Sequence, residues 1–179
     1  MTKFLLSIHV LAAIVAIGPV TVAASMFPGV VRRAQAEPGD AHHVTTLRVL
    51  HRISRVYAAV GVVIPVFGLA TANSLGVLGD AWLVVSIALT AIAAGVLMVL
   101  VLPRQERIVA DFASLVEAGP ATDAGSAPAA SATPAASAVA VGPDRRLGAR
   151  LAMHTGLFNL LWAAVTVLMI IRPGSTTGA

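Results

Sequence analysis

The sequence predicts an all-α protein: a four-helix transmembrane bundle forming one membrane domain, with both termini outside the cell. Four apolar stretches, at residues 4–27, 56–78, 81–102 and 151–171, are each long enough to cross a bilayer core, which takes about 20 residues. Only 11% of the residues are charged and the mean hydropathy is +0.89, whereas a soluble domain carries about a quarter charged residues. The strict alternation of apolar and polar residues that is typical of a transmembrane β-barrel is absent, so we do not expect a barrel.

The first stretch is interrupted only by His9 and by Gly18-Pro19. A cleaved signal peptide is an alternative, because Lys3 precedes the stretch and Thr21-Val22-Ala23 resembles a cleavage site. The apolar run is longer than the 7–15 residues typical of a signal peptide, so we expect it to be retained as a span.

The second stretch contains Pro65, and proline predicts a kink there as it does at Pro19. Kinked spans can expose backbone carbonyls to a ligand in transporters, which keeps a small transporter among the alternatives. The third stretch, 81–102, is the most uniformly apolar, and the fourth, 151–171, includes His154 and Asn159.

Arginine positions predict the orientation. The loop after the first span and the loop after the third span carry almost all the basic residues: Arg32, Arg33, Arg48, Arg52, Arg55, Arg104, Arg107, Arg145, Arg146 and Arg150. The other side offers only Lys3 and Arg172. By the positive-inside rule we expect both long loops to be cytoplasmic. The Ala-, Arg- and Val-rich usage is typical of a high-GC bacterium, and we expect the protein in the bacterial plasma membrane. The +4 charge and pI of 11.1 therefore reflect topology, and we expect no nucleic-acid partner.

The loop after the third span has two parts. Residues 103–117 place Ile108, Phe112, Leu115 and Val116 at helical spacing, which predicts an amphipathic interfacial helix along the headgroups. Residues 118–143 are mostly Ala, Pro, Ser, Thr and Gly, a composition that cannot bury enough apolar surface to order itself and predicts a flexible linker.

Histidines are the candidate cofactor-binding residues, because imidazole is a common ligand and titrates near neutrality. His9 lies near the outer face, and His154 and His51 lie near the inner face. About 27 Å separates His9 from the inner end of its span, so His9 and His154 cannot share one haem. A structural histidine bonded to a neighbour is the alternative. No metal site is predicted: the chain has no Cys, and His42-His43 is interpreted as a loop feature.

Arg48, Arg52 and Arg55 follow i, i+4, i+7 spacing and form one basic ridge if the second span continues as a helix into the cytoplasm. We expect this ridge to bind anionic headgroups, at about 1 kcal/mol for each charge. A dock for a carboxylated or phosphorylated substrate is the alternative, because guanidinium pairs with such groups in a bidentate manner.

Residues 3–9 read KFLLSIH and precede a helix with a central Gly18-Pro19; His51-Arg52 and Arg55 precede a proline-containing second span. In these features the chain resembles bacterial four-helix integral membrane proteins of unknown function, similar in layout to HemJ-type protoporphyrinogen oxidases and CopD-type copper-resistance membrane domains. The resemblance implies a functional early-helix histidine. The HemJ pattern also has an intramembrane lysine, whereas the only lysine here is Lys3.

No P-loop, HExxH or nucleophile elbow occurs, and no catalytic residue is predicted. The leading expectation is a non-enzymatic protein that binds haem or another redox or metal partner through an intramembrane histidine. The alternatives are a HemJ-like membrane oxidoreductase, a small transporter or metal-handling protein, and an accessory subunit that packs against a membrane-protein partner or a second copy.

Overall fold

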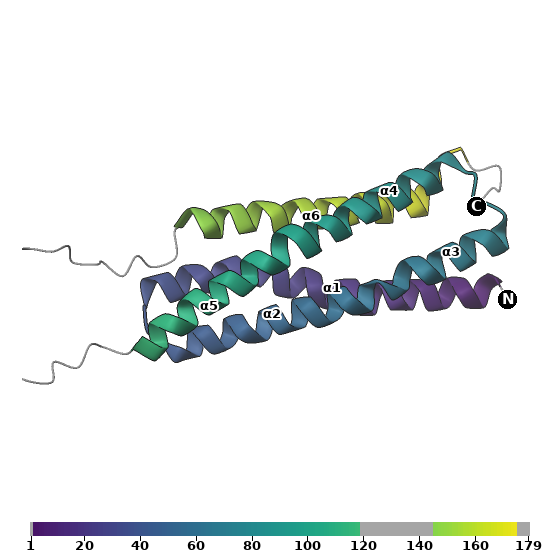
Figure 1. The fold of residues 1–179 in the computed structure, drawn as a ribbon. Helices are drawn as coiled ribbons and strands as arrows, with labels where there is room; N and C mark the ends of the chain where they lie inside the picture. Colours follow the sequence, from purple (N-terminus) through teal and green to yellow (C-terminus); the bar gives the residue numbers. More distant parts are fainter. Residues whose placement is uncertain (1, 119–144, 175–179) are drawn as a thin grey trace, which may run out of the picture.

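The computed structural model describes residues 2–118 and 145–174, and every regular element in them is a helix. The elements are α1 (Thr2–Ala36), α2 (Ala41–Gly61), α3 (Val63–Leu75), α4 (Ala81–Gly95), the π-helix η1 (Val96–Val101), α5 (Leu102–Ala118) and α6 (Arg145–Ile171). Because α2 leads into α3, and α4 leads through η1 into α5, the chain forms four long rods (Figure 1). Within the described residues, four helices are long and apolar enough to cross a membrane, so the predicted all-α fold with four membrane-spanning helices is confirmed.

The segment predicted as the first cytoplasmic loop is instead a helical hairpin. α1 continues to Ala36, and α2 begins at Ala41. Gly39, with φ of 92°, turns the chain, and the Asp40 side chain accepts a hydrogen bond of 2.7 Å from the His42 backbone N–H. Such a cap supplies a partner for a helix-end N–H. All the arginines predicted in that loop are therefore held on helices.

The second rod is interrupted where the sequence predicts a kink. The chain turns at Val62, whose N–H bonds to the Ala59 carbonyl at 3.2 Å, and α3 begins at Val63. Pro65, two residues into α3, cannot donate to the carbonyl four residues earlier, which explains the break. At the corresponding proline of the first rod, Pro19, α1 continues as one helix.

The third rod contains the π-helix immediately before Pro103. Without an N–H, Pro103 cannot continue the α-helical ladder, and a π-type stretch accommodates that gap. The predicted amphipathic helix at 103–117 corresponds to α5, but it extends the rod in line instead of bending away (Figure 1). Its apolar residues Ile108 and Phe112 are buried in the bundle core beside α2, not left free to lie against headgroups.

Helix α1 is the central element of the bundle. It contacts α2, α3, α5 and α6, and its Phe27 and Val31 are almost fully buried. The first residues of α1 and the last residues of α6 lie at the same end of the molecule (Figure 1). The predicted linker 118–143 lies outside the described residues except for Ala118, the last residue of α5.

At the end of the molecule where α1 begins and α6 ends, a few polar contacts hold the α3–α4 turn and join it to α6. Gly76, with φ of 68°, ends α3, and its N–H bonds to the Asn73 carbonyl. Asp80 accepts a hydrogen bond of 2.9 Å from the Trp82 indole, and the Arg172 guanidinium lies 5.6 Å from the Trp82 ring centroid. This cation–π contact joins the end of α6 to the start of α4.

Candidate functional site: the arginine-rich end and its groove

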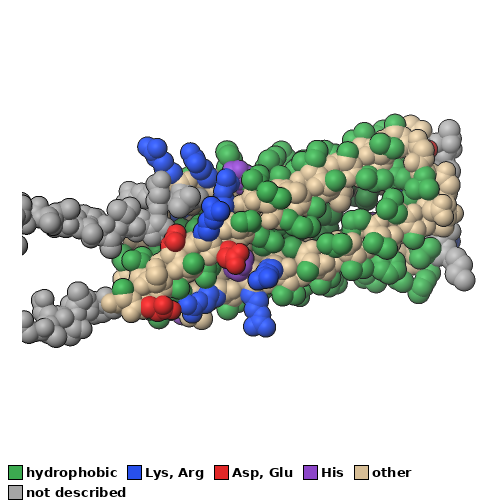
Figure 2. Space-filling view, in the orientation of Figure 1, with side chains coloured by type: hydrophobic (Ala, Val, Ile, Leu, Met, Phe, Trp, Pro, Cys, Tyr) green, Lys and Arg blue, Asp and Glu red, His purple; other side chains and the backbone are tan. Residues whose placement is uncertain are grey.

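Charged side chains gather over one end of the molecule, while hydrophobic side chains cover the rest of the visible face (Figure 2). This arginine-rich end contains the α1–α2 hairpin, α5 and the start of α6. Large apolar side chains remain exposed along the other part, among them Val15, Val66 and Ile170. That distribution is expected of a protein whose apolar part is covered by lipid.

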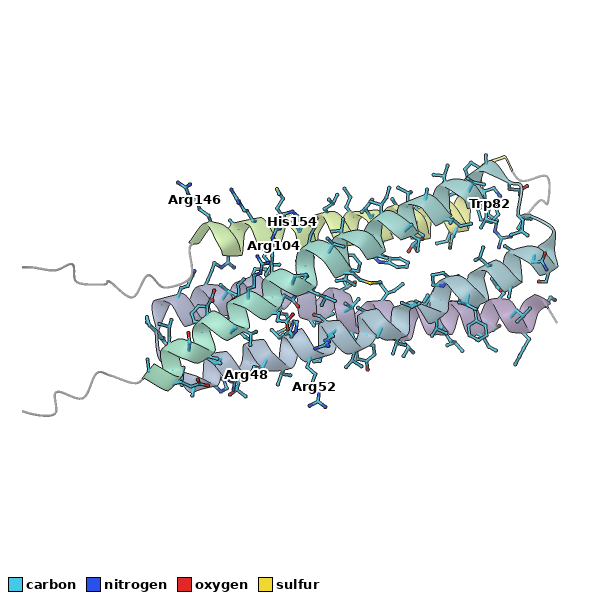
Figure 3. The ribbon with its side chains drawn as sticks, viewed as in Figure 1. Arg48, Arg52, Trp82, Arg104, Arg146 and His154 are labelled. Atoms are coloured by element: carbon cyan, nitrogen blue, oxygen red, sulfur yellow. The ribbon has the colours of Figure 1, made fainter. Side chains whose placement is uncertain are left out.

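The predicted basic ridge is present on α2. Arg48, Arg52 and Arg55 are all exposed, and Arg52 points away from the bundle (Figure 3). None of the three forms a hydrogen bond or ion pair within residues 2–118 and 145–174. The ridge therefore carries three charges without counter-ions from the described protein, directed toward its surroundings.

A groove of about 460 Å³ lies between α1 and α6 at this same end. It is lined from α1 by residues including Ser25, Arg32 and Arg33, and from α6 by Thr155 and Asn159 among others. The Asn159 Nδ2 donates to Ser25 Oγ at 3.0 Å, so one hydrogen bond joins the two walls. A second hollow, of about 400 Å³, is lined only by apolar residues of α6 and by Pro173.

Two groove residues carry buried polar atoms without partners: Thr155 Oγ1 and Asn159 Oδ1. Thr155 is only 3% exposed. Most helical hydroxyls here donate to the carbonyl four residues earlier, as Thr71, Ser86 and Thr166 do at 2.8–2.9 Å. Thr155 makes no such bond, and a buried polar group without a partner is costly.

His9 packs against the second rod instead of facing a cavity. Its Nδ1 lies 3.2 Å from the Ile64 carbonyl oxygen, next to the break in that rod. The imidazole also rests against Gly68: a Cβ at Gly68 would stand 2.9 Å from His9 Cε1. Neither of the two cavities described above is lined by His9. The geometry is that of a histidine bonded to a neighbouring helix.

His51 contacts a buried glutamine. Its Nδ1 lies 3.4 Å from Gln105 Oε1, which joins α2 to α5. Gln105 is fully buried and its Nε2 has no partner; nearby on α2, the buried Ser54 Oγ also has none. Sequence reasoning missed this pair, because Gln105 falls in a segment predicted to lie at the surface.

His154 is engaged by two arginines of the arginine-rich end. The Arg104 guanidinium Nη1 lies 2.8 Å from His154 Nδ1 and 3.0 Å from Nε2, and Arg104 and His154 face each other in Figure 3. His154 Nδ1 also contacts the Arg150 carbonyl. With Nδ1–H donating to that carbonyl, Nε2 accepts from Arg104. His9, His51 and His154 thus contact different residues, and they do not converge on one site.

The histidine pair 42-43, interpreted as a loop feature, lies in the first turn of α2. His43 Nε2 lies 3.3 Å from Glu37 Oε2 and 3.7 Å from Asp40 Oδ2. Sequence reasoning overlooked these two carboxylates, although both precede the pair closely. The three groups stabilise the α1–α2 turn and lie close enough together to offer ligand atoms to one ion.

No family model, curated protein or solved structure matches this chain. The candidate site is therefore defined by geometry: the Arg48–Arg52–Arg55 ridge outside the bundle, and the α1–α6 groove with its unpaired buried groups.

Proposed function

We propose that this chain is a non-enzymatic, multi-pass protein of the bacterial plasma membrane that binds anionic lipid headgroups through its arginine-rich end, which faces the cytoplasm. One observation carries the proposal: Arg48, Arg52 and Arg55 are exposed on one side of α2 and have no carboxylate partner among the described residues. Anionic headgroups supply the missing counter-charge, at about 1 kcal/mol for each arginine.

A soluble anionic substrate is the less favoured occupant of this ridge. A substrate dock needs side chains that converge on a cavity, and neither described cavity is lined by Arg48, Arg52 or Arg55. Exposed arginines next to the apolar surface of a membrane-spanning rod instead suit the headgroup layer that surrounds the bundle. The exposed apolar side chains of the remaining bundle support a bilayer as the source of those headgroups.

The test is lipid-dependent thermal stability of the purified protein in a mild zwitterionic or neutral detergent. Added phosphatidylglycerol should raise the melting temperature more than phosphatidylcholine does, and salt should weaken the difference. The triple variant Arg48→Gln/Arg52→Gln/Arg55→Gln should lose most of the difference between the two lipids.

A matched pair of single variants separates the ridge from net charge. Arg52→Gln removes one positive charge at the ridge, and Lys3→Gln removes one at the opposite end. Only Arg52→Gln should reduce the preference for phosphatidylglycerol. Equal effects of the two variants, or a triple variant with the wild-type preference, would overturn the proposal.

A second candidate function is binding of haem or another redox or metal partner at His9. The observation that favours it is the contact of His9 Nδ1 with the Ile64 carbonyl, because ligating histidines usually donate their other ring N–H to such an acceptor. The resemblance to HemJ-type and CopD-type layouts supports the same residue. An absorbance spectrum and elemental analysis test it: a Soret band or bound metal that is lost in His9→Ala is expected, and a colourless, metal-free protein refutes it.

A further inference from the structure

The groove between α1 and α6 has two arginines at its lining and combines them with two features that the exposed ridge lacks. It is a concave space of about 460 Å³, and it contains buried polar atoms with no partner in the described protein. Arg32 and Arg33 form no ion pair within the described residues. Such a set of groups is complementary to a ligand that carries both negative charge and hydrogen-bonding oxygens.

The order of these groups along the two helices fits a membrane-derived ligand. Arg32 and Arg33 lie two turns beyond Ser25 toward the arginine-rich end, and Asn159, on the facing wall, lies at the level of Ser25 because the two side chains are bonded. Thr155 precedes Asn159 by one helical turn, so it lies between that level and the arginines. On the other side of Ser25, the exposed Val22 continues the surface as apolar.

A ligand in this groove thus meets positive charge, then hydroxyl and amide groups, then apolar surface. An anionic phospholipid has the same sequence of groups: phosphate, glycerol with its ester oxygens, and acyl chains. We infer that the α1–α6 groove binds one anionic phospholipid molecule, with its phosphate at Arg32 and Arg33, its glycerol and ester oxygens at Thr155 and Asn159, and its acyl chains along Met26 and Val22. This inference rests on the proposed lipid binding and adds a defined site to it.

Thr155 provides the most informative variant. Thr155→Val keeps the shape of the side chain and removes the hydroxyl that has no partner. In lipid-free protein the melting temperature should stay the same or rise, because an unpaired buried hydroxyl is lost. The apparent affinity for phosphatidylglycerol should fall about tenfold. A residue needed only for folding would instead lower the melting temperature without changing lipid affinity.

A second variant fills the groove without touching its polar groups. A Cβ at Gly156 meets nothing within 4 Å, so the larger side chain of Gly156→Leu has space to enter the groove. This variant should fold, since leucine favours helix more than glycine does, and it should no longer retain the lipid.

The experiment is native mass spectrometry of the full chain, first delipidated and then titrated with phosphatidylglycerol. The wild type should retain one lipid per chain under conditions that remove the others. Thr155→Val, Gly156→Leu and Arg32→Gln/Arg33→Gln should lose it. Arg48→Gln/Arg52→Gln, which removes the same charge outside the groove, should keep it. Groove variants that retain the lipid like the wild type would overturn the inference.

Two further comparisons show whether a negative result contradicts the groove site or the proposed lipid binding at the ridge. Inorganic phosphate alone should neither stabilise the protein nor displace the lipid; if it does both, the groove is a free-phosphate site and the inference is wrong. If groove variants keep the lipid while the ridge variants lose their preference for phosphatidylglycerol, the inference fails and the proposed function stands. If the groove variants lose the lipid and the ridge variants behave like the wild type, the site stands and the ridge proposal fails.

Discussion

His9 and Gly68 show how one small residue determines what a polar residue in a span does. The imidazole fits against the second rod only because Gly68 has no side chain, and this close approach brings His9 Nδ1 to the Ile64 carbonyl. The contact joins the first span to the second just after the break at Val62. A histidine that looks like a ligand in the sequence therefore also has a packing role.

Gly68→Ala is expected to lower the free energy of unfolding by about 1–3 kcal/mol, because the new methyl would overlap the His9 ring. The double variant His9→Ala/Gly68→Ala should cost less than the sum of the single variants, since the ring no longer opposes the methyl. Thermal denaturation in detergent measures both. The control is Gly95→Ala, where a Cβ meets nothing within 4 Å; an equal loss in the control would contradict the contact.

Variants of Gln105 test whether its buried side chain stabilises the protein through the hydrogen bonding of its amide or through the volume that it fills. Its Nε2 has no partner, and its Oε1 has only the 3.4 Å contact with His51. Gln105→Leu should change the free energy of unfolding by less than about 1 kcal/mol, because it fills similar space without an unpaired group. Gln105→Ala should cost about 2 kcal/mol or more by leaving a cavity. Equal destabilisation by both variants would show that the amide itself is required.

At the level of elements, the π-helix and α5 determine how the third rod meets the others. η1 carries the buried Val96, Leu97 and Val101 at the point where the rod passes from the apolar part of the bundle to the arginine-rich end. Beyond it, α5 contributes Ile108 and Phe112 to the core. The arginine-rich end thus has a packed interior, to which α1, α2 and α5 contribute and which is continuous with the core of the apolar part.

Phe112→Ala is expected to destabilise the protein by about 3–5 kcal/mol, because the ring is only 2% exposed and lies in the core. A helix lying on headgroups would not respond in this way, since its phenylalanine would face lipid. The measurement is thermal denaturation combined with limited proteolysis of residues 102–118, which should be cut faster in the variant. Arg107→Ala, at an exposed position of the same helix, should stay within about 0.5 kcal/mol of the wild type.

The four spans could be predicted from the sequence because hydropathy over about 20 residues depends on local composition alone. The extent of the helices could not, since residues 28–55 are rich in arginine and resemble a loop in composition. Pro38-Gly39-Asp40 is a local turn and capping pattern and could have placed the α1–α2 turn. The groove could not be predicted, because it depends on contacts between Ser25 and Asn159, which are far apart in the chain.

At the scale of the whole molecule, three of the four rods are longer than a bilayer is thick. The third rod has 38 residues, or about 57 Å at 1.5 Å per residue, against a hydrocarbon core of about 30 Å. The excess lies at the arginine-rich end, because there α1, α2 and α5 extend beyond the apolar surface of the bundle (Figure 2). An extension made by α1, α2, α5 and the start of α6 therefore projects on one side of the membrane, with the ridge and the groove near its base.

The side on which this extension projects can be tested cleanly, because the chain contains no cysteine. Gly79→Cys places a thiol in the exposed turn between α3 and α4, and Thr45→Cys places one on the exposed face of α2. An impermeant maleimide should label Gly79→Cys in intact spheroplasts and Thr45→Cys only after permeabilisation, because arginine-rich segments stay in the cytoplasm. The reverse pattern would place the ridge and the groove in the outer leaflet, so the lipid proposal would fail in its cytoplasmic form even if both sites bind lipid in detergent.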